Sequence, residues 1–129
     1  MPIINQWDNT EKTVYLFIMY DEWDWSDYQA NMRDGYEAIK TVSHKVDIIY
    51  AYISGLPSGD AIHYLTLASE AQPANCYRSM IVNPKGEILQ MMIGAVDNMR
   101  NWEGPKFVNT VDEARQYLIQ AASENTTNR

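Results

Sequence analysis

Ser58 is the residue of this chain whose type and position are best suited to chemistry. It stands in the loop Ser54–Asp60, between an apolar strand and a helix predicted to start near Gly59. The N-terminus of a helix stabilises a phosphate group, so Ser58 is a candidate phosphosite, with Ser54, Gly59 and Asp60 as candidate partner contacts around it. The same position suits a helix N-cap, because a serine hydroxyl accepts hydrogen bonds from helix N–H groups. Asp60 lies close by and residues 46–70 contain no Lys or Arg, which favours the N-cap.

Two tryptophans form a second candidate site at the mouth of the first predicted helix. Trp23 and Trp25 alternate there with Asp21, Glu22 and Asp24. Aromatic side chains ringed by charge are typical of a protein interface or of the rim of a ligand site. The alternative is a lid that packs on the end of the hydrophobic core.

A third candidate site combines Tyr50 and Tyr52, late in a strand, with His63 on the helix that follows. The carboxyl end of a parallel sheet is a common position for ligands, so these residues could line a pocket for a small apolar or aromatic ligand or a lipid. Tyrosine is also a good strand former, and the alternative is that the two tyrosines simply fill the core.

The sequence contains no motif for catalysis or metal binding. Asp21 and Glu22 are adjacent, and nothing indicates a raised pKa. The chain has no Gly-rich phosphate loop and no nucleophile elbow. His44, His63 and Cys76 are not at metal-ligand spacing, and the apolar neighbours of Cys76 predict a buried, inert thiol. We therefore expect neither an enzyme nor a bound metal or cofactor.

Length and charge narrow the class of protein further. The chain has 129 residues, 46% of them hydrophobic, which predicts one globular domain. Its net charge is −7, and residues 1–37 alone hold eight acids against Lys12 and Arg33. Negative charge repels phosphate backbones, so nucleic acid is an unsuitable partner. No apolar run is long enough to span a membrane, and the N-terminus lacks a leader pattern, which predicts a cytoplasmic protein.

Five strands are predicted from short apolar segments bounded by turn residues. The first two form a hairpin, and the second and third are apolar on both faces, as in the middle of a sheet. The predicted strands cover Ile3–Trp7, Thr13–Tyr20, Val46–Ile53, Cys76–Val82 and Phe107–Val108.

Four helices are predicted between and after these strands. Ser26 is the expected N-cap of the first, in which Gly35 allows a close approach to the sheet, and Thr110 with Glu113 forms a capping box for the last. The second covers 59–71. The third covers 87–99, with a strand over 88–93 as the alternative, and carries Met91, Met92 and Met99 as core residues or as a docking face. Residues 124–129 are expected to form a disordered tail after a domain spanning 1–123.

The order of these elements and several short motifs resemble the STAS family, the SpoIIAA-like fold of anti-sigma factor antagonists. The matching segments are Trp23-Asp24-Trp25-Ser26, Val46-Asp47-Ile48-Ile49, Pro73-Ala74-Asn75 and Phe107 to Ala114. Small stand-alone STAS-like proteins of bacteria are the most similar in these features. In the antagonist branch, a serine at the start of the second helix is phosphorylated by a partner anti-sigma kinase. Ser58-Gly59 stands at that point here, preceded by Pro57 instead of Asp.

The resemblance implies a single α/β domain with a mostly parallel five-stranded sheet and four helices. It also implies a non-enzymatic regulatory or protein-interaction module. Its partner, an anti-sigma-factor-like protein or another regulator, would contact the loop and helix start after the third strand. The alternative function is binding of a small apolar or aromatic ligand or a lipid at the carboxyl end of the sheet. The oligomeric state stays open, with a homodimer as one alternative.

Overall fold

The protein forms one α/β domain, and the computed structural model describes residues 3–84, 86 and 106–127. Its five strands are β1 (Ile3–Trp7), β2 (Val14–Met19), β3 (Val46–Tyr52), β4 (Cys76–Val82) and β5 (Lys106–Val108). The helices described are α1 (Trp25–Lys40), α2 (Ala61–Ala71) and α4 (Val111–Thr127). The helix predicted over 87–99, its strand alternative over 88–93, and Met91, Met92 and Met99 lie outside the described residues.

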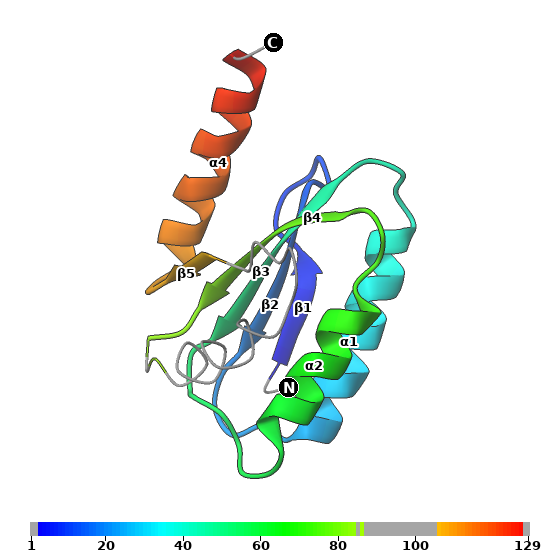
Figure 1. Ribbon diagram of the computed structural model, residues 1–129, viewed down its shortest axis with the longest axis vertical. Helices are drawn as coiled ribbons and strands as arrows, with labels where there is room; N and C mark the ends of the chain where they lie inside the picture. Colours follow the sequence, from blue (N-terminus) through cyan, green and yellow to red (C-terminus); the bar gives the residue numbers. More distant parts are fainter. Residues whose placement is uncertain (1–2, 85, 87–105, 128–129) are drawn as a thin grey trace.

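The strands form a single mixed sheet in the order β1-β2-β3-β4-β5. β1 pairs antiparallel with β2, as the predicted hairpin requires, and the other neighbouring strands pair in parallel. α1 and α2 lie side by side on one face of the sheet, and α4 lies on the other (Figure 1). The predicted α/β class and the mostly parallel five-stranded sheet are therefore confirmed.

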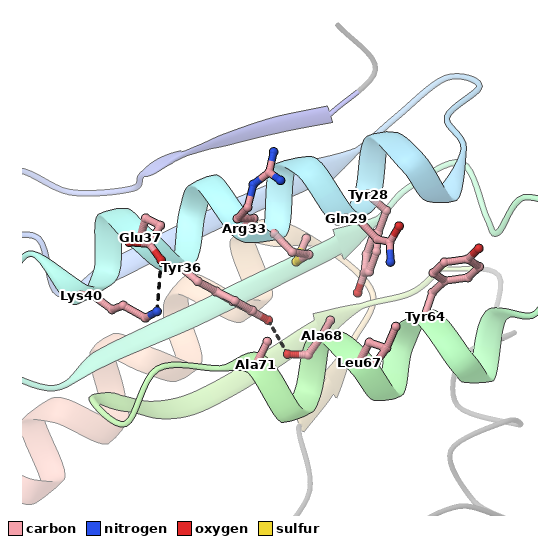
Figure 2. Close-up of a pocket in the computed structure, with 11 residues that line it drawn as sticks. Tyr28, Gln29, Arg33, Tyr36, Glu37, Lys40, Tyr64, Leu67, Ala68 and Ala71 are labelled. Carbon is pink, nitrogen blue, oxygen red and sulfur yellow. Dashed lines mark hydrogen bonds and ion pairs between the residues drawn. The ribbon is translucent and has the colours of Figure 1, made fainter.

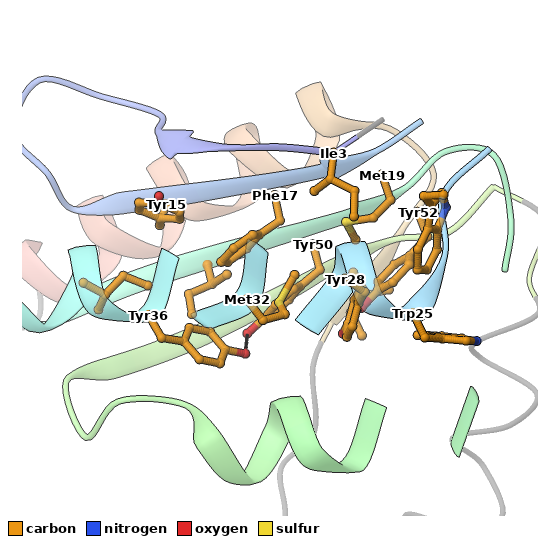
Figure 3. Packing of buried hydrophobic residues seen from close by; sticks show 14 of the residues in the cluster. Ile3, Tyr15, Phe17, Met19, Trp25, Tyr28, Met32, Tyr36, Tyr50 and Tyr52 are labelled. Carbon is orange, nitrogen blue, oxygen red and sulfur yellow. Dashed lines mark hydrogen bonds between the residues drawn. The ribbon is translucent and has the colours of Figure 1, made fainter. Parts of the chain in front are cut away.

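The alternation of side chains along β2 and β3 separates two hydrophobic cores. Phe17 and Ile48 belong to the core beneath α1 and α2, while Leu16 and Ile49 belong to the core beneath α4. All four side chains are at most 1% exposed, which explains why both strands read as continuous apolar runs. Figure 3 shows the first core from within, with aromatic residues of β2 and β3 facing α1.

α1 approaches the sheet closely at Gly35. A Cβ atom at this position would overlap the ring of Phe17 and lie 2.9 Å from Cε1 of Tyr15. The absence of a side chain therefore lets α1 rest directly on the aromatic rings of β2, as the sequence predicted.

The first two helix caps differ from the predicted ones. Asp24, not Ser26, is the N-cap of α1: its carboxylate accepts a hydrogen bond from the N–H of Asp27 at 2.8 Å. Asp27 completes the capping box by accepting from the N–H of Asp24, so Ser26 lies within the first turn. Asp60, not Ser58, is the N-cap of α2, accepting from the N–H of His63 at 3.1 Å. Aspartate is as good an N-cap residue as serine. As a result, α1 starts two residues earlier than its predicted cap implied, and α2 starts two residues later.

The last helix begins as predicted and ends later. The hydroxyl of Thr110 accepts a hydrogen bond from the N–H of Glu113 at 3.0 Å, while the Glu113 carboxylate accepts from the N–H of Asn109. Arg115 anchors the helix through two hydrogen bonds to the carboxylate of Asp8, at 2.9 and 2.7 Å. α4 continues to Thr127, so residues 124–127 are helical where the sequence predicted a disordered tail.

Candidate functional site

The loops that follow β2 and β3 are joined by a direct hydrogen bond. The Ser54 hydroxyl donates to the carbonyl of Asp21 at 2.7 Å, and the N–H of Ile53 donates to the carbonyl of Met19 at 3.0 Å. Asp21 has a positive φ of 55°, a left-handed conformation that is uncommon outside glycine, although Asp and Asn adopt it more readily than other residues. Ser54 thus holds Asp21 in place. We call loops 20–24 and 53–60, with the first turns of α1 and α2, the carboxyl-end surface.

The two tryptophans of this region lie beneath the surface. Trp23 is 7% exposed and Trp25 is 6% exposed, so both side chains are buried with the core, where the lid alternative places them, and they do not form an exposed rim. The Trp25 ring stacks on Tyr64 with centroids 5.1 Å apart and planes 8° apart. Trp23 packs on Trp25 and Tyr28 at 5.1 and 5.6 Å. This cluster joins the start of α1 to the start of α2.

Trp25 carries a buried donor without an acceptor among the described residues. Its Nε1 is shielded from solvent and makes no hydrogen bond there. Gly59 covers this edge of the indole: a Cβ atom on Gly59 would lie 3.3 Å from Nε1. A buried donor without an acceptor lowers the free energy of unfolding by about 1–3 kcal/mol. The loop at Gly59 therefore covers a locally destabilising group.

Ser58 lies outside α2 and is exposed. The adjoining Asp60 occupies the helix N-cap with its own carboxylate. A phosphate on Ser58 would thus meet a negative group, and residues 46–77 contain no Lys or Arg to pair with it. The N-cap role predicted for Ser58 is wrong, and its environment offers no cation from β3 or α2.

Tyr50 and Tyr52 are core residues, 6% and 2% exposed. Their hydroxyls bond to tyrosines of α1: Tyr50 to Tyr36 at 2.8 Å and Tyr52 to Tyr28 at 3.0 Å. Burial raises the pKa of Tyr28 to about 12 and raises the pKa values of Tyr50 and Tyr52 well above their ordinary range. The four hydroxyls therefore stay protonated at neutral pH and serve as hydrogen-bonding groups between α1 and β3.

His63 is separate from these tyrosines. It is exposed on α2 and contacts the edge of Tyr64, with ring centroids 5.1 Å apart. Cys76, at the start of β4, is half-buried, and burial raises the pKa of its thiol to about 12. Within the described part of the chain, no three His, Cys, Asp or Glu side chains gather in a way that could hold a metal ion.

A groove between α1 and α2 is a feature that the sequence analysis missed. It has a volume of about 230 Å³ and is shown in Figure 2. None of Tyr50, Tyr52 and His63, the residues expected to line a pocket, is among the residues that line it. The sequence did contain a signal that two helix faces could meet here, because each helix carries a stripe of apolar and aromatic residues at helical spacing. The stripe of α1 is Tyr28, Met32 and Tyr36, and that of α2 is Tyr64, Leu67 and Ala71. The lining residues are Tyr28, Gln29, Met32, Arg33, Tyr36, Glu37, Lys40, Tyr64, Leu67, Ala68 and Ala71.

Exposed apolar side chains and acidic groups share the carboxyl-end surface. Ile53 is 40% exposed and Ile62 is 55% exposed, the first at the start of the loop 53–60 and the second shortly after its end. Four exposed acids lie in the same loops, namely Asp21, Glu22, Asp24 and Asp60. Residues 13–32 and 46–77 contain no Lys or Arg. Among described residues, the cations Lys12, Lys45 and Arg78 lie toward the amino ends of the strands.

Known proteins provide no further information about this site. No described helix is both long and apolar enough to cross a membrane. No protein-family model matches the chain, and neither the curated proteins nor the solved structures contain a match.

Proposed function

We propose that the protein is a non-enzymatic interaction module of STAS-like type. In this proposal the carboxyl-end surface contacts a positively charged partner protein. The supporting observation is that exposed isoleucines share that surface with acids that have no ion-pair partner among the described residues. The order of strands and helices is compatible with the STAS-like assignment, which rests on the sequence motifs.

Charge determines the chemistry of the partner. The acids at Asp21, Glu22, Asp24 and Asp60 have no cation beside them in loops 20–24 and 53–60. A partner that carries Lys or Arg is attracted to this surface, and attraction of this kind raises association rates and selects against acidic partners. Individual exposed ion pairs add little affinity, because water and salt screen them.

Apolar contact provides the affinity. Ile53 and Ile62 are exposed on either side of the loop, and exposed fractions near one half leave much of each side chain for a partner to bury. Burial of apolar area contributes about 25 cal/mol per Å², so two isoleucines can anchor a partner whose basic residues fit the surrounding acids. The partner segment is therefore expected to combine apolar side chains with Lys or Arg.

A random peptide display library selected on the immobilised protein tests the proposal. The enriched peptides are expected to carry excess Lys or Arg next to aliphatic or aromatic residues, and to bind more weakly as salt is added. Ile62→Gln should reduce their affinity about 5- to 30-fold, the effect of removing one apolar anchor. The matched control is Ile119→Gln, because Ile119 is 65% exposed on α4, on the opposite face.

Two results would overturn the proposal. The first is enrichment of peptides without excess positive charge. The second is equal affinity of the selected peptides for the original protein and for Ile62→Gln. Circular dichroism of both variants shows that the fold is kept, and Ile62→Gln is expected to be tolerated because the side chain is more than half exposed.

A further inference from the structure

We propose that the groove between α1 and α2 binds a small ligand with one aromatic ring and a carboxylate. The groove shares Tyr28 and Tyr64 with the carboxyl-end surface but extends along α1 and α2 away from loops 20–24 and 53–60. Its rim carries Arg33 and Lys40, where those loops carry acids, so this inference does not depend on the proposed partner. Drug-sized ligands occupy pockets of about 300–1,000 Å³. The volume of about 230 Å³ therefore suits a single-ring compound.

The walls of the groove are suited to an aromatic ring. α1 contributes Tyr28, Met32 and Tyr36, and α2 contributes Tyr64 and Leu67. Leu67 is 40% exposed and would be covered by the ring. Methionine and aromatic side chains make favourable contacts with a bound ring through sulfur and offset stacking. The Tyr36 hydroxyl donates a hydrogen bond to the carbonyl of Ala68 at 3.1 Å, and this hydrogen bond joins α1 to α2 beside the groove (Figure 2).

The polar rim of the groove favours an anion. Gln29 and Arg33 are one helical turn apart on α1 and can both donate hydrogen bonds. Neither side chain has a hydrogen-bond or ion-pair partner among the described residues. The only acid in the lining, Glu37, already pairs with Lys40 at 3.1 Å. The rim thus carries an unopposed guanidinium, although the chain as a whole has a net charge of −7.

The position of the rim groups fits a carboxylate bound at the edge of the groove. Figure 2 shows the Gln29 amide on the α2 side of α1, while Arg33 extends away from α2. Arg33 is exposed and has no bond to break, so rotation of its side chain can bring the guanidinium over the groove. Guanidinium and carboxylate match in geometry and form charge-assisted hydrogen bonds. The ring would lie against Met32 and Leu67 with its carboxylate toward Gln29 and Arg33.

Titration of the protein with phenylacetate, followed by backbone amide NMR, tests the inference. Saturable shifts are expected at Gln29, Arg33 and Leu67, with a dissociation constant on the order of 0.1–1 mM for a ligand of this size. Two compounds of similar shape serve as comparators: 2-phenylethanol is neutral, and 2-phenylethylamine is cationic. Phenylacetate should bind about 5- to 10-fold more tightly than either.

Three variants make the test specific to the groove. Arg33→Gln should abolish the preference for phenylacetate over 2-phenylethanol while leaving both able to bind. Leu67→Trp should fill the groove and weaken all three compounds. Lys45→Gln removes a cation that lies over Tyr77, away from the groove, and should change nothing. Absence of saturable shifts in α1 and α2, equal binding of the amine, or unchanged binding to Leu67→Trp would each overturn the inference.

Discussion

The hydroxyl groups of Tyr36 on α1 and Tyr50 on β3 lie 2.8 Å apart and form a hydrogen bond. The other hydrogen bonds of the two hydroxyls determine which of them donates. Tyr36 donates its proton to the carbonyl of Ala68 on α2, so its oxygen accepts the proton of Tyr50. Tyr50 in turn accepts from the side-chain amide of Gln72 at 2.7 Å. This chain of donors joins α1, α2 and β3 inside an otherwise apolar layer, and it holds α2 in the position that forms the groove.

Tyr36→Phe should lower the free energy of unfolding by about 1–3 kcal/mol. The variant removes the bond to Ala68 and leaves the buried Tyr50 hydroxyl without its acceptor. Urea denaturation measures the change. Tyr77→Phe is the matched control, because Tyr77 is 50% exposed and should lose little. Equal stability of the two variants would show that the buried hydroxyl chain does not hold α2.

Stability should fall at alkaline pH, starting near the ordinary tyrosine pKa of about 10. Burial raises the pKa values of Tyr28, Tyr36, Tyr50 and Tyr52, the first to about 12. Above pH of about 10 the unfolded chain loses these protons while the folded chain keeps them. The unfolded state then binds fewer protons, so the free energy of unfolding decreases as pH rises.

The slope can be measured by urea denaturation at a series of pH values. Each buried tyrosine contributes up to about 1.4 kcal/mol per pH unit between the two pKa values. Tyr28→Phe should reduce the slope by about one such contribution. A free energy of unfolding that stays constant while ultraviolet absorbance shows the tyrosines ionising would contradict this account.

Asn75→Ala should destabilise the protein by about 1–3 kcal/mol. The Asn75 amide nitrogen lies within 3.0–3.2 Å of the carbonyls of Ile39, Val42 and His44, and so closes the C-terminus of α1 and the chain that leads to β3. Thermal unfolding checks this, with Ala74→Ser as a control at the exposed neighbouring residue. Equal melting temperatures for the two variants would rule out this role.

Much of the fold could be predicted from the sequence, because apolar periodicity and turn residues are local signals. β1 and β4 have the predicted bounds, and Gly35 lies against the sheet as expected. The N-cap residues were harder to predict, because aspartate and serine are equally good caps. Asp24 and Ser26 compete for the start of α1, and Ser58 and Asp60 compete for the start of α2. The burial of Trp23 and Trp25 depends on contacts with Tyr28 and Tyr64, which only the folded chain brings together.

Ser58→Glu distinguishes two kinds of regulation at the carboxyl-end surface. A carboxylate at this exposed position adds to the charge of Asp60, so binding of a basic peptide should be unchanged or stronger. Isothermal titration with the selected peptides measures the effect, and Ser58→Gln controls for side-chain size. Weaker binding of Ser58→Glu alone would instead indicate that negative charge at Ser58 releases the partner.

Amide NMR of the protein with a selected basic peptide is the most direct measurement of where a partner binds. We expect the largest shifts at Ile53, Ser58, Asp60 and Ile62, and we expect Asp21 to shift with them through its hydrogen bond to Ser54. Amides of α4 should remain unchanged. Shifts centred on α4, or on Tyr77 and Lys45 at the opposite end of the sheet, would contradict the proposed interaction surface.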